Sequence, residues 1–563
     1  MSPLRTRIVL VLVCTILFVP FLGGVHLFDW DEVNFAECAR EMIVTGDYLH
    51  VQIDFRPFYE KPPLFIWLQV LSMNVFGVNE FAARFPTALV GIATILVLFS
   101  IGTEVRSQRF GTLWCVAYVG SLLPHFYFRS GIIDPLFNLF IFLAIWFMKK
   151  GIGQKGQGSL GVGSAMIAGV FSGAAVMTKG PVGFGLVMMT TVIAWYVLRK
   201  EMSFPWRHVL VVTGTTVFVG SLWYVAEYIQ NGPTFIIENL TYQFRLLTTG
   251  EAGHEQPWYY HSLVLLFGCY PASAFFLGGM RKSNEEESAQ RAMRIWMTVL
   301  FFVVLVMFSI VKTKIVHYSS LTYLPMTYLA ALALERWLSS SRRWPWYQSV
   351  AIFTLSIVIC AVTCAIPLAL MHRDWLLTLS PFRDQFLRAS LQQNISWIGI
   401  EPYIAFIIFA GAILAWFFMR RQKPLAAIGI LFGSVAVFIA LYVPLVAPRI
   451  EAVTQGSAID FYESLRGRDV YVKPLTMKSY AHLFYTEKPY ALSGAAKHIS
   501  ADDWEPWLLN GPIDRPAYFV AKVNDATPWR AHPHLRVYRE GGGFVIFERI
   551  PISLQQDSLP RSH

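Results

Sequence analysis

Long apolar runs are the feature that most constrains this sequence. The stretches "RIVLVLVCTILFVPFLGGVHLF", "RFPTALVGIATILVLFSIG" and "MRIWMTVLFFVVLVMFSIV" are each about long enough to cross a hydrocarbon core of roughly 30 Å as a helix. Of the 563 residues, 55% are hydrophobic and only 15% are charged, whereas a soluble protein carries about 25% charged residues. Most of the chain is therefore predicted to be surrounded by lipid.

The apolar runs and the charge clusters between them predict about thirteen membrane helices. The first run is interpreted as a retained span and not as a signal peptide, because no small-x-small cleavage site follows it cleanly and further spans come after it. The predicted spans are residues 7–25, 80–103, 110–126, 132–149, 164–180, 181–198, 208–229, 261–280, 294–311, 315–334, 348–371, 399–419 and 424–446.

Basic residues mark every second junction between these spans. Because cytoplasmic loops of membrane proteins carry an excess of Lys and Arg, this alternation places the N-terminus in the cytoplasm and, with an odd number of spans, the C-terminus on the outer side. The charge of +10 is spread over the ends of apolar segments and forms no single basic stripe, which argues against nucleic-acid binding. The junctions contain Arg5 and Arg7; Arg106 and Arg109; Lys149, Lys150 and Lys155; Arg199, Lys200 and Arg207; Arg281, Lys282, Arg291 and Arg294; Arg336, Arg342 and Arg343; Arg420, Arg421 and Lys423.

The last part of the chain, residues 447–563, has a different pattern. The long apolar runs stop, and the short alternating pieces "DVYVK", "AYFVAKV", "LRVYRE" and "GGFVIFERI" are typical of strands. The predicted fold class is thus an all-α integral membrane domain, residues 1–446, followed by a small soluble α/β domain, residues 447–563, on the outer face. Six cysteines lie mostly inside apolar runs and are interpreted as core residues, without disulfides.

The first outer loop, residues 26–79, is too long and too patterned to be a simple connector. In "DEVNFAECAREMIVTGDY" the apolar residues share one helical face and Glu37, Arg40 and Glu41 fall elsewhere. This pattern predicts an amphipathic helix that lies on the membrane surface and ends at Gly46. The segment "PLFIWLQVLSMNVFG" predicts a second helix that is short for a span.

Ionisable residues gather at the outer ends of the predicted spans. Asp134 begins a span in "RSGIIDPLFNL", where it could cap the helix, and Lys179 ends one in "MTKGPVG". Charges at membrane depth are costly and usually face a cavity or a partner. The cluster is therefore a functional-site hypothesis, and the other members on this side are Asp31, Glu60, Lys61, His254, Lys312, Lys314 and His317.

These residues also have ordinary structural interpretations. Asp31 could cap the predicted amphipathic helix, and Glu60 and Lys61 could form a solvated interfacial pair. Lys179 could extend its ammonium to lipid headgroups, and His254 could be a surface-loop histidine. Their shared location at one mouth of the helix bundle is what favours a common function.

Six motifs, taken in order, resemble those of a known family. They are "WDEVNFAECAREM", "FYEKPPLFIWL", "RFPTALVG", "RSGIIDPLF", "MTKGPVG" and "GHEQPWYYH", and they span residues 30 to about 262. The chain resembles the polytopic glycosyltransferases with the GT-C fold, a group that contains protein O-mannosyltransferases and the bacterial transferases that place 4-amino-4-deoxy-L-arabinose on lipid A. The Glu-Lys-Pro-Pro motif is closer to the aminoarabinose branch.

The resemblance implies roles for individual residues. Asp31 and Asp134 match two acids required in the cavity, and Glu32 is counted with them as a catalytic candidate. Lys61 would bind the phosphate of a polyprenyl-phosphate sugar donor, with Lys179 and Arg245 as helpers.

The resemblance also implies a metal site and shows one departure. Glu60 and His254 match a pair that can hold a divalent metal ion, either Zn or Mg/Mn. Related sequences often read Asp-Glu-x-Arg, whereas Asn34 stands here in place of that Arg. A cation that could contact phosphate is therefore missing at this position.

The function implied is that of an inverting glycosyltransferase in the bacterial inner membrane, most like the transfer of 4-amino-4-deoxy-L-arabinose to a lipid A phosphate. Asp31 or Asp134 would act as general base toward a hydroxyl acceptor, or would orient a phosphate acceptor or the sugar. The absence of a Gly-rich phosphate loop after a strand fits a lipid-linked donor. The alternatives are another glycolipid or glycan acceptor, transfer to protein Ser/Thr as in the O-mannosyltransferases, a lipid-linked sugar transporter, and a non-catalytic scaffold.

Overall fold

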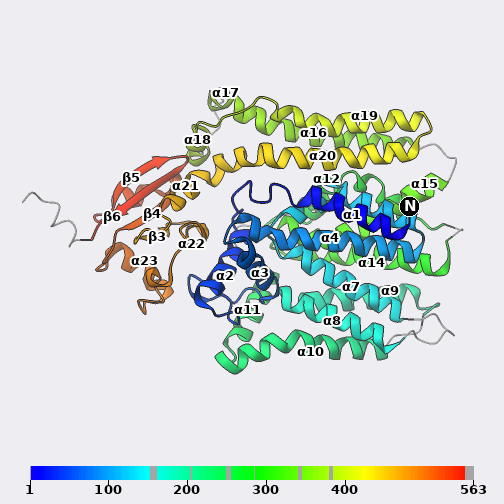
Figure 1. The fold of residues 1–563 in the computed structure, drawn as a ribbon, viewed down its shortest axis with the longest axis horizontal. Coiled ribbons are helices and arrows are strands. Elements are labelled where there is room, and N and C mark those ends of the chain that lie inside the picture. The colour runs from blue at the N-terminus through cyan, green and yellow to red at the C-terminus, as the bar shows by residue number, and fades with distance from the viewer. Residues whose placement is uncertain are drawn as a thin grey trace, which may run out of the picture.

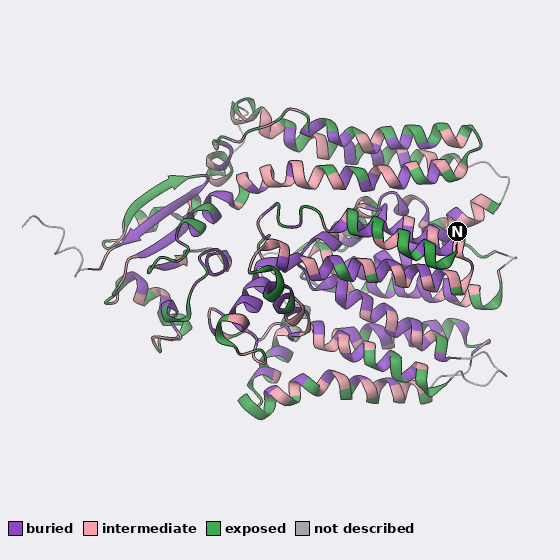
Figure 2. Ribbon diagram, viewed as in Figure 1, coloured by how far each residue is buried: buried purple, intermediate pink, exposed green. Residues whose placement is uncertain are grey.

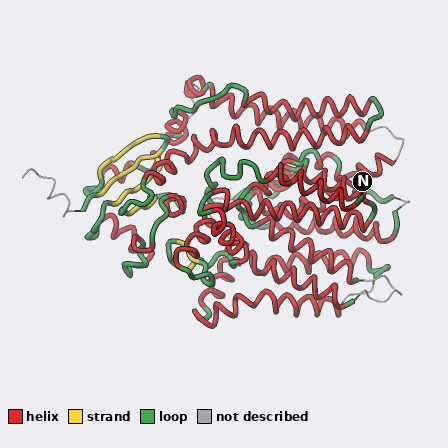
Figure 3. Tube along the Cα trace, viewed as in Figure 1, coloured by secondary structure: helices red, strands yellow, loops and turns green. Residues whose placement is uncertain are grey.

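A computed structural model describes residues 2–152, 161–202, 206–248, 255–283, 286–339, 345–378 and 384–551. Long helices run side by side through most of the molecule, and the four-stranded sheet lies at one end of them (Figures 1 and 3). The α-helices are α1 (Pro3–Phe18), α2 (Asp31–Thr45), α3 (Leu64–Phe76), α4 (Glu80–Val105), α5 (Gln108–Val119), α6 (Leu122–Phe126), α7 (Asp134–Gly151), α8 (Val162–Lys179), α9 (Val182–Leu198), α10 (Trp206–Asn231), α11 (Thr234–Thr248), α12 (Tyr260–Gly268), α13 (Phe276–Met280), α14 (Ser288–Ile310), α15 (Tyr323–Ser339), α16 (Trp346–Met371), α17 (Arg373–Thr378), α18 (Gln385–Leu391), α19 (Phe406–Arg420), α20 (Pro424–Glu451), α21 (Ser457–Ser464), α22 (Ala481–Tyr485), α23 (Ala501–Asn510) and α24 (Thr527–Arg530).

Short helical turns and strands complete the described elements. The strands are β1 (Gln52–Ile53), β2 (Arg56–Pro57), β3 (Tyr471–Pro474), β4 (Ala517–Lys522), β5 (Arg536–Gly541) and β6 (Phe544–Arg549). The short turns are η1 (Tyr127–Arg129), η3 (Ala272–Ala274), η4 (Val316–Thr322), η5 (Glu401–Ala405), the π-helical η6 (Ala452–Gly456), η7 (Tyr490–Leu492) and η8 (Val523–Asp525).

All thirteen predicted spans coincide with helical segments, and the chain is a multi-span membrane protein. Within the described ranges, 7 single helices are long and apolar enough to cross a membrane, or 8 if a bent pair counts as one span. That pair is Leu122–Arg129 with Asp134–Gly151, which meet at 116°. The predicted spans at 261–280 and 315–334 are broken into shorter helices, so the number thirteen stays a prediction.

The helix bundle is built by close packing inside and apolar side chains outside. In α8, a Cβ added at Gly169 would lie 2.5 Å from the Cβ of Thr215, and one at Gly173 would lie 2.6 Å from the Cβ of Val219. These glycines let α8 and α10 approach closely, as small residues do between membrane helices. The outer faces of α10 and α16 are largely exposed and apolar, as expected for contact with lipid (Figure 2).

The first outer loop forms the two predicted helices, α2 and α3, but one prediction about α2 is wrong. Gly46 ends α2 in the left-handed conformation with φ 72°, as expected for a C-terminal glycine. The polar face of α2 does not lie in water on a membrane surface, because Glu37, Arg40 and Glu41 are all buried. Arg40 pairs with Glu37 and donates to the carbonyl of Lys488, so this face of α2 packs against the C-terminal domain.

The C-terminal domain contains a four-stranded sheet in the order β3-β4-β6-β5. Strand β3 is parallel to β4, whereas β4 and β5 are both antiparallel to β6. The β5–β6 hairpin turns at Gly542 and Gly543, where φ is 59° and 83°, a region that favours glycine. All four segments predicted as strands form strands. The helix α20 runs past the predicted border at 446/447 and continues through η6 into α21.

The C-terminal domain and the first outer loop share one hydrophobic core. Buried residues of α2 and α3 contact buried residues of α21, α22, β4 and β6 in a single cluster. These elements lie at the end of the bundle away from the N-terminus, and α2 and α3 lie next to α11 (Figure 1). The first outer loop and the C-terminal domain, which the charge pattern predicts on the same side of the membrane, therefore pack against each other.

Candidate active site

A cavity of about 930 Å³ lies where the helix bundle meets the first outer loop and the C-terminal domain. Its lining comes from the start of α2, the turn before α3, the start of α7, the α8–α9 join, α11, the α14–η4 join and the loop after β3. Among the described residues, the lining contains four carboxylates, three lysines and one histidine, which are Asp29, Asp31, Glu60, Asp134, Lys61, Lys179, Lys478 and His317. Five of the eight predicted site residues thus meet in one place.

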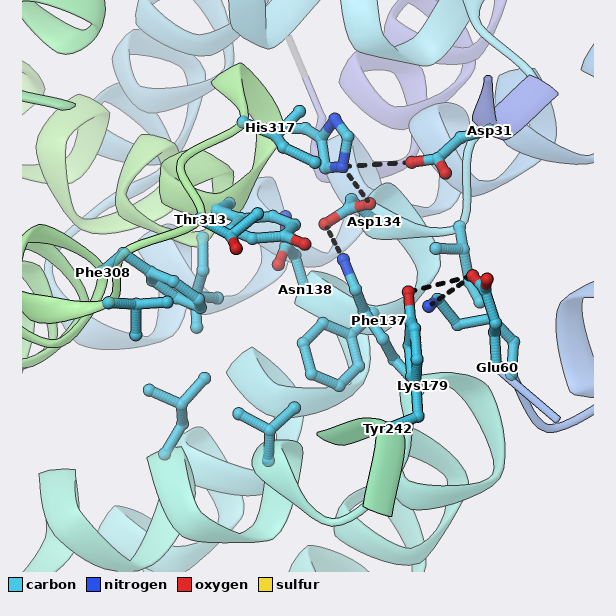
Figure 4. Close-up of a pocket in the computed structure, with 18 of the residues that line it drawn as sticks. Asp31, Glu60, Asp134, Phe137, Asn138, Lys179, Tyr242, Phe308, Thr313 and His317 are labelled. Atoms are coloured by element: carbon cyan, nitrogen blue, oxygen red, sulfur yellow. Dashed lines mark hydrogen bonds and ion pairs between the residues drawn. The ribbon is translucent and has the colours of Figure 1, made fainter. Parts of the chain in front are cut away.

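A chain of opposite charges crosses the cavity (Figure 4). Lys179 Nζ donates to Asp134 Oδ1 at 2.7 Å. His317 Nε2 lies 3.8 Å from Asp134 Oδ2 and 3.2 Å from Asp31 Oδ2. The imidazole therefore stands between the two carboxylates that the sequence predicted as catalytic.

Helix ends position these groups. Asp134 occupies the first turn of α7, beside Pro135, where the helix dipole favours a carboxylate. Lys179 is the last residue of α8, where the dipole favours a cation, and Gly180, with φ 90°, turns the chain toward α9. Lys179 does not reach toward lipid headgroups, because its ammonium is held by Asp134.

Asp31 faces the cavity and does not cap α2. The residue before the helix is Trp30, which makes no side-chain cap, and Asp31 is the first helical residue. Burial alone would raise the pKa of Asp31, but the hydrogen bond and charge of His317, with the charges of Lys61 and Lys179, outweigh burial and lower the pKa to about 2. Asp31 is therefore ionised at neutral pH.

Glu60 and Lys61 form a second polar group in the same cavity. Glu60 Oε2 accepts a hydrogen bond from the Tyr242 hydroxyl at 3.0 Å and lies 3.9 Å from Lys61 Nζ. The Lys61 ammonium also lies 5.0 Å from the centre of the Tyr242 ring. Asn239 donates to the carbonyl of Tyr59 at 2.7 Å and so fixes the turn. Lys61 is buried, which excludes a fully solvated interfacial pair.

An apolar wall continues the cavity between α9 and the end of α14. It is lined by Val182, Leu186 and Met189 on one side and by Met307 and Val311 on the other. The phosphate-binding candidates and an apolar surface are therefore parts of one cavity, an arrangement suited to a ligand with an anionic head and a hydrocarbon chain.

Glu32, predicted as catalytic, is a structural residue. Its Oε2 accepts from Arg84 Nη2 at 2.7 Å and from the backbone N–H of Phe28 at 2.9 Å. Its Oε1 accepts from Arg84 Nε at 3.0 Å and from the backbone N–H of Gly131. The carboxylate is buried, does not line the cavity and has both oxygens occupied, so we remove Glu32 from the catalytic candidates.

The two remaining predicted residues are not placed in the cavity. Arg245 is exposed on α11, where its guanidinium lies 5.7 Å from the centre of the Tyr242 ring, and it is not part of the described lining. His254 lies outside the described residues. The roles of Arg245 and His254 stay predictions.

The predicted metal pair has one described member. Glu60 carries a carboxylate that fits a divalent cation, and its nearest described partners are Tyr242 and Lys61. In the part of the chain that the structure describes, the group of three possible metal ligands is His26, Glu80 and Glu463, outside this cavity. A metal ion at Glu60 and His254 stays a prediction.

Three cavity residues could not be given a role from the sequence. His317 belongs to the predicted outer cluster, but nothing in the sequence pairs it with Asp31. Tyr242 follows the helical pattern of α11 and carries no motif. Lys478 lies in the C-terminal domain, more than 400 positions after Asp31, and carries no local signal of a site.

The fold and the cavity define a class, that of polytopic membrane proteins with the GT-C fold. The chain superposes on the crystal structure of ArnT from Cupriavidus metallidurans bound to undecaprenyl phosphate with a TM-score of 0.75. The superposition covers 97% of this chain and 98% of that one, at 18% sequence identity. The fold class predicted from the sequence is confirmed.

Sequence comparisons agree with this class and confirm the resemblance. Residues 60–224 match the family described as dolichyl-phosphate-mannose-protein mannosyltransferase. An undecaprenyl phosphate-alpha-4-amino-4-deoxy-L-arabinose arabinosyl transferase of Enterobacter sp. (strain 638) is 25% identical over 346 residues, 59% of this chain and 60% of that protein. The enzyme of the same name from Edwardsiella ictaluri is 24% identical over 329 residues, which are 56% of this chain and 57% of that protein. The chain thus spans about three fifths of the curated relatives it matches.

Proposed function

We propose that this protein is an inverting glycosyltransferase that moves 4-amino-4-deoxy-L-arabinose from a polyprenyl-phosphate donor to a phosphate of lipid A. The observation that carries the proposal is the joining of Lys61, Lys179, Asp31 and Asp134 to an apolar wall in one cavity. The names of the relatives, which are undecaprenyl phosphate-dependent arabinosyl transferases, supply the sugar and the donor lipid.

The reaction is a single displacement. An acceptor oxygen attacks the anomeric carbon of the donor sugar, and the bond from that carbon to the phosphate oxygen breaks. The polyprenyl phosphate leaves with the bonding electrons and an additional negative charge. Lys61 and Lys179 stabilise that charge in a cavity that is partly shielded from water.

The ionisation state of Asp31 bears on its role in the reaction. A general base works best with a pKa near the operating pH, and the pKa of Asp31 is about 2. A hydroxyl of a protein Ser or Thr needs such a base, whereas a phosphate is already ionised. Asp31 is therefore suited to orient the sugar, and a hydroxyl acceptor would need another base, such as Asp134.

The fold also supports an orientation in the bacterial inner membrane. The cavity, the first outer loop and the C-terminal domain share the end of the bundle that is opposite the N-terminus (Figure 1). With the basic junctions in the cytoplasm, this end faces the periplasm, where the C-terminal domain covers the site.

The test is sugar transfer by the detergent-purified full chain. Undecaprenyl phosphate-aminoarabinose is incubated with lipid A or with a periplasmic protein extract, and products are identified by mass spectrometry. We expect modified lipid A, inversion at the anomeric carbon, and loss of transfer in Lys61→Ala. Transfer to protein alone would overturn the proposal that lipid A is the acceptor. If the folded protein moves the donor lipid without cleaving a bond, the proposal that it is an enzyme is overturned.

A further inference from the structure

One wall of the cavity comes from the C-terminal domain. The loop between β3 and α22, residues 475–480, reaches the start of α2 and brings Lys478 to the cavity lining beside Asp29 and Trp30. The Lys478 ammonium lies 5.6 Å from the centre of the Trp30 ring. This wall shares no motif with the donor-binding residues and has no role in the reaction described above.

Lys478 differs from the other two lysines of the cavity. Lys61 lies 3.9 Å from Glu60, and Lys179 lies 2.7 Å from Asp134. In the described residues no carboxylate pairs with Lys478 within ion-pair distance, and its side chain is exposed to the cavity. An exposed cation–aromatic contact is weaker than a hydrogen bond between an ammonium and a charged group. The ammonium can therefore move from the ring to an anion.

The Trp30 ring, which forms an aromatic platform under Lys478, is held in place by Asn34 and by Tyr480. With its amide oriented to pair donors with acceptors, Asn34 accepts from the indole N–H of Trp30 at 3.0 Å and donates to the Trp30 carbonyl at 2.9 Å. The Tyr480 ring packs against Trp30 with centres 5.3 Å apart. Asn34, which stands where a cation was expected, thus supports the ring that carries the cation of the C-terminal domain.

Asp29, the carboxylate next to Trp30 in the sequence, repels a bound anion only weakly. Desolvation by the surrounding protein raises the pKa of Asp29 to about 6, and the hydrogen bond from Ser479 and the charge of Lys522 offset only part of that effect. Asp29 is therefore protonated more readily than an ordinary aspartate when a negative group approaches.

We propose that Lys478 binds the phosphate monoester of the acceptor and thereby sets the preference of the cavity for phosphorylated acceptors. The proposal rests on the proposed function and deepens it, because it gives the C-terminal domain a direct part in acceptor choice. The donor phosphate is held by Lys61 and Lys179 from the membrane domain, and the acceptor phosphate by Lys478 from the other domain.

The experiment compares kinetic constants for the two substrates in the full chain. In Lys478→Ala we expect the KM for lipid A to rise about tenfold or more, the loss of one charge-assisted hydrogen bond. We expect the KM for undecaprenyl phosphate-aminoarabinose to stay the same, and Lys478→Arg to restore most of the acceptor affinity. The matched control is Lys497→Ala, which removes a lysine that lies over aromatic rings of the same domain but outside the cavity.

Two results would overturn the proposal. A raised KM for the donor would place Lys478 at the donor phosphate, and unchanged constants for both substrates would leave it without a role. If the wild-type protein transfers no sugar, the proposed function fails, and binding of lipid A to the detergent-solubilised protein then tests Lys478 directly. A tenfold weaker affinity of Lys478→Ala for lipid A, with unchanged affinity of Lys497→Ala, would support the phosphate site without turnover, and equal affinities would reject it.

Discussion

Asp31 and Glu32 are neighbours in sequence with opposite environments. Glu32 is buried, and Arg84 together with two backbone N–H groups occupies both of its oxygens. Asp31 is 26% exposed, faces the cavity and has His317 as its ion-pair partner. The difference teaches that two adjacent carboxylates can differ in role, because the oxygens of Glu32 are fully used by structural partners whereas Asp31 remains open to the cavity.

The same distinction separates two larger groups of charges. Arg40 and Glu37 form a buried, doubly hydrogen-bonded pair under the C-terminal domain. Asp134 in the cavity binds Lys179 through one oxygen, and its other oxygen has no hydrogen-bond partner among the described residues. A buried oxygen without a partner costs about 1–3 kcal/mol, a cost that a hydroxyl group of a bound sugar would remove.

The largest effect is expected for Glu32→Gln, which tests whether Glu32 is a structural residue. The substitution leaves the buried Arg84 guanidinium without its carboxylate, which costs about 3–5 kcal/mol when one partner of a buried pair is removed. We expect a lower unfolding temperature in detergent and a lower folded yield, with the transfer rate per folded molecule within about twofold of the wild type. Normal stability with lost turnover would return Glu32 to the catalytic residues.

Asp31→Asn should have the converse effect. The amide keeps the shape of the side chain but removes the charge that faces the cavity. We expect sugar transfer to fall about 10²–10³-fold, the usual range for the loss of one electrostatic group at a reacting centre, with little change in unfolding temperature. The exposed Asp374 of α17, substituted by Asn, is the control. A fall in stability without a loss of rate per folded molecule would contradict the assignment.

His317→Gln tests the environment of Asp31 through the pH dependence of the transfer rate. His317 is the main group that lowers the pKa of Asp31 against the effect of burial, so its loss raises that pKa. We expect about a tenfold lower rate at pH 7, in line with one hydrogen bond to a charged group. We also expect the acid-side fall in rate to lie at higher pH than in the wild type, because the pKa of Asp31 rises. Parallel pH profiles for the two proteins would show that His317 does not control Asp31.

The smallest expected effect is at Asp29. A carboxyl whose folded pKa is raised above its usual value of 3.8 to about 6 lowers the stability of the fold as pH rises through that window. Asp29→Asn should therefore raise the unfolding temperature at pH 7 and leave it unchanged at pH 4. Because Asp29 is exposed to the cavity, the gain should stay below about 1 kcal/mol. A gain of the same size at pH 4 would assign the effect to packing.

The sequence predicted the fold better than it predicted which charged residues line the cavity and which have structural roles. Apolar runs gave the helices, and period-two patterns gave all four strands of the sheet. The roles of Asp31 and Glu32 could not be separated, because the partner of Glu32 is Arg84, which stands 52 positions later inside an apolar motif. That partnership exists only after the first loop folds against α4.

Lys478 and the burial of α2 were unpredictable for a related reason. The polar face of α2 has the pattern of a helix on a membrane surface, and only the presence of the C-terminal domain turns that face into a buried one. The motif around Lys61 and the helix-end positions of Asp134 and Lys179 were recognisable, because local sequence alone fixes where they lie.

The shared core of the first outer loop and the C-terminal domain has a consequence for biosynthesis. The residues of α2 and α3 are translated well before their buried partners in the C-terminal domain, such as Phe461, Tyr518 and Ile546. The first loop therefore waits, with its apolar face uncovered, while the intervening helices are inserted. The cavity wall that contains Lys478 therefore forms only after the C-terminal domain has packed against the start of α2.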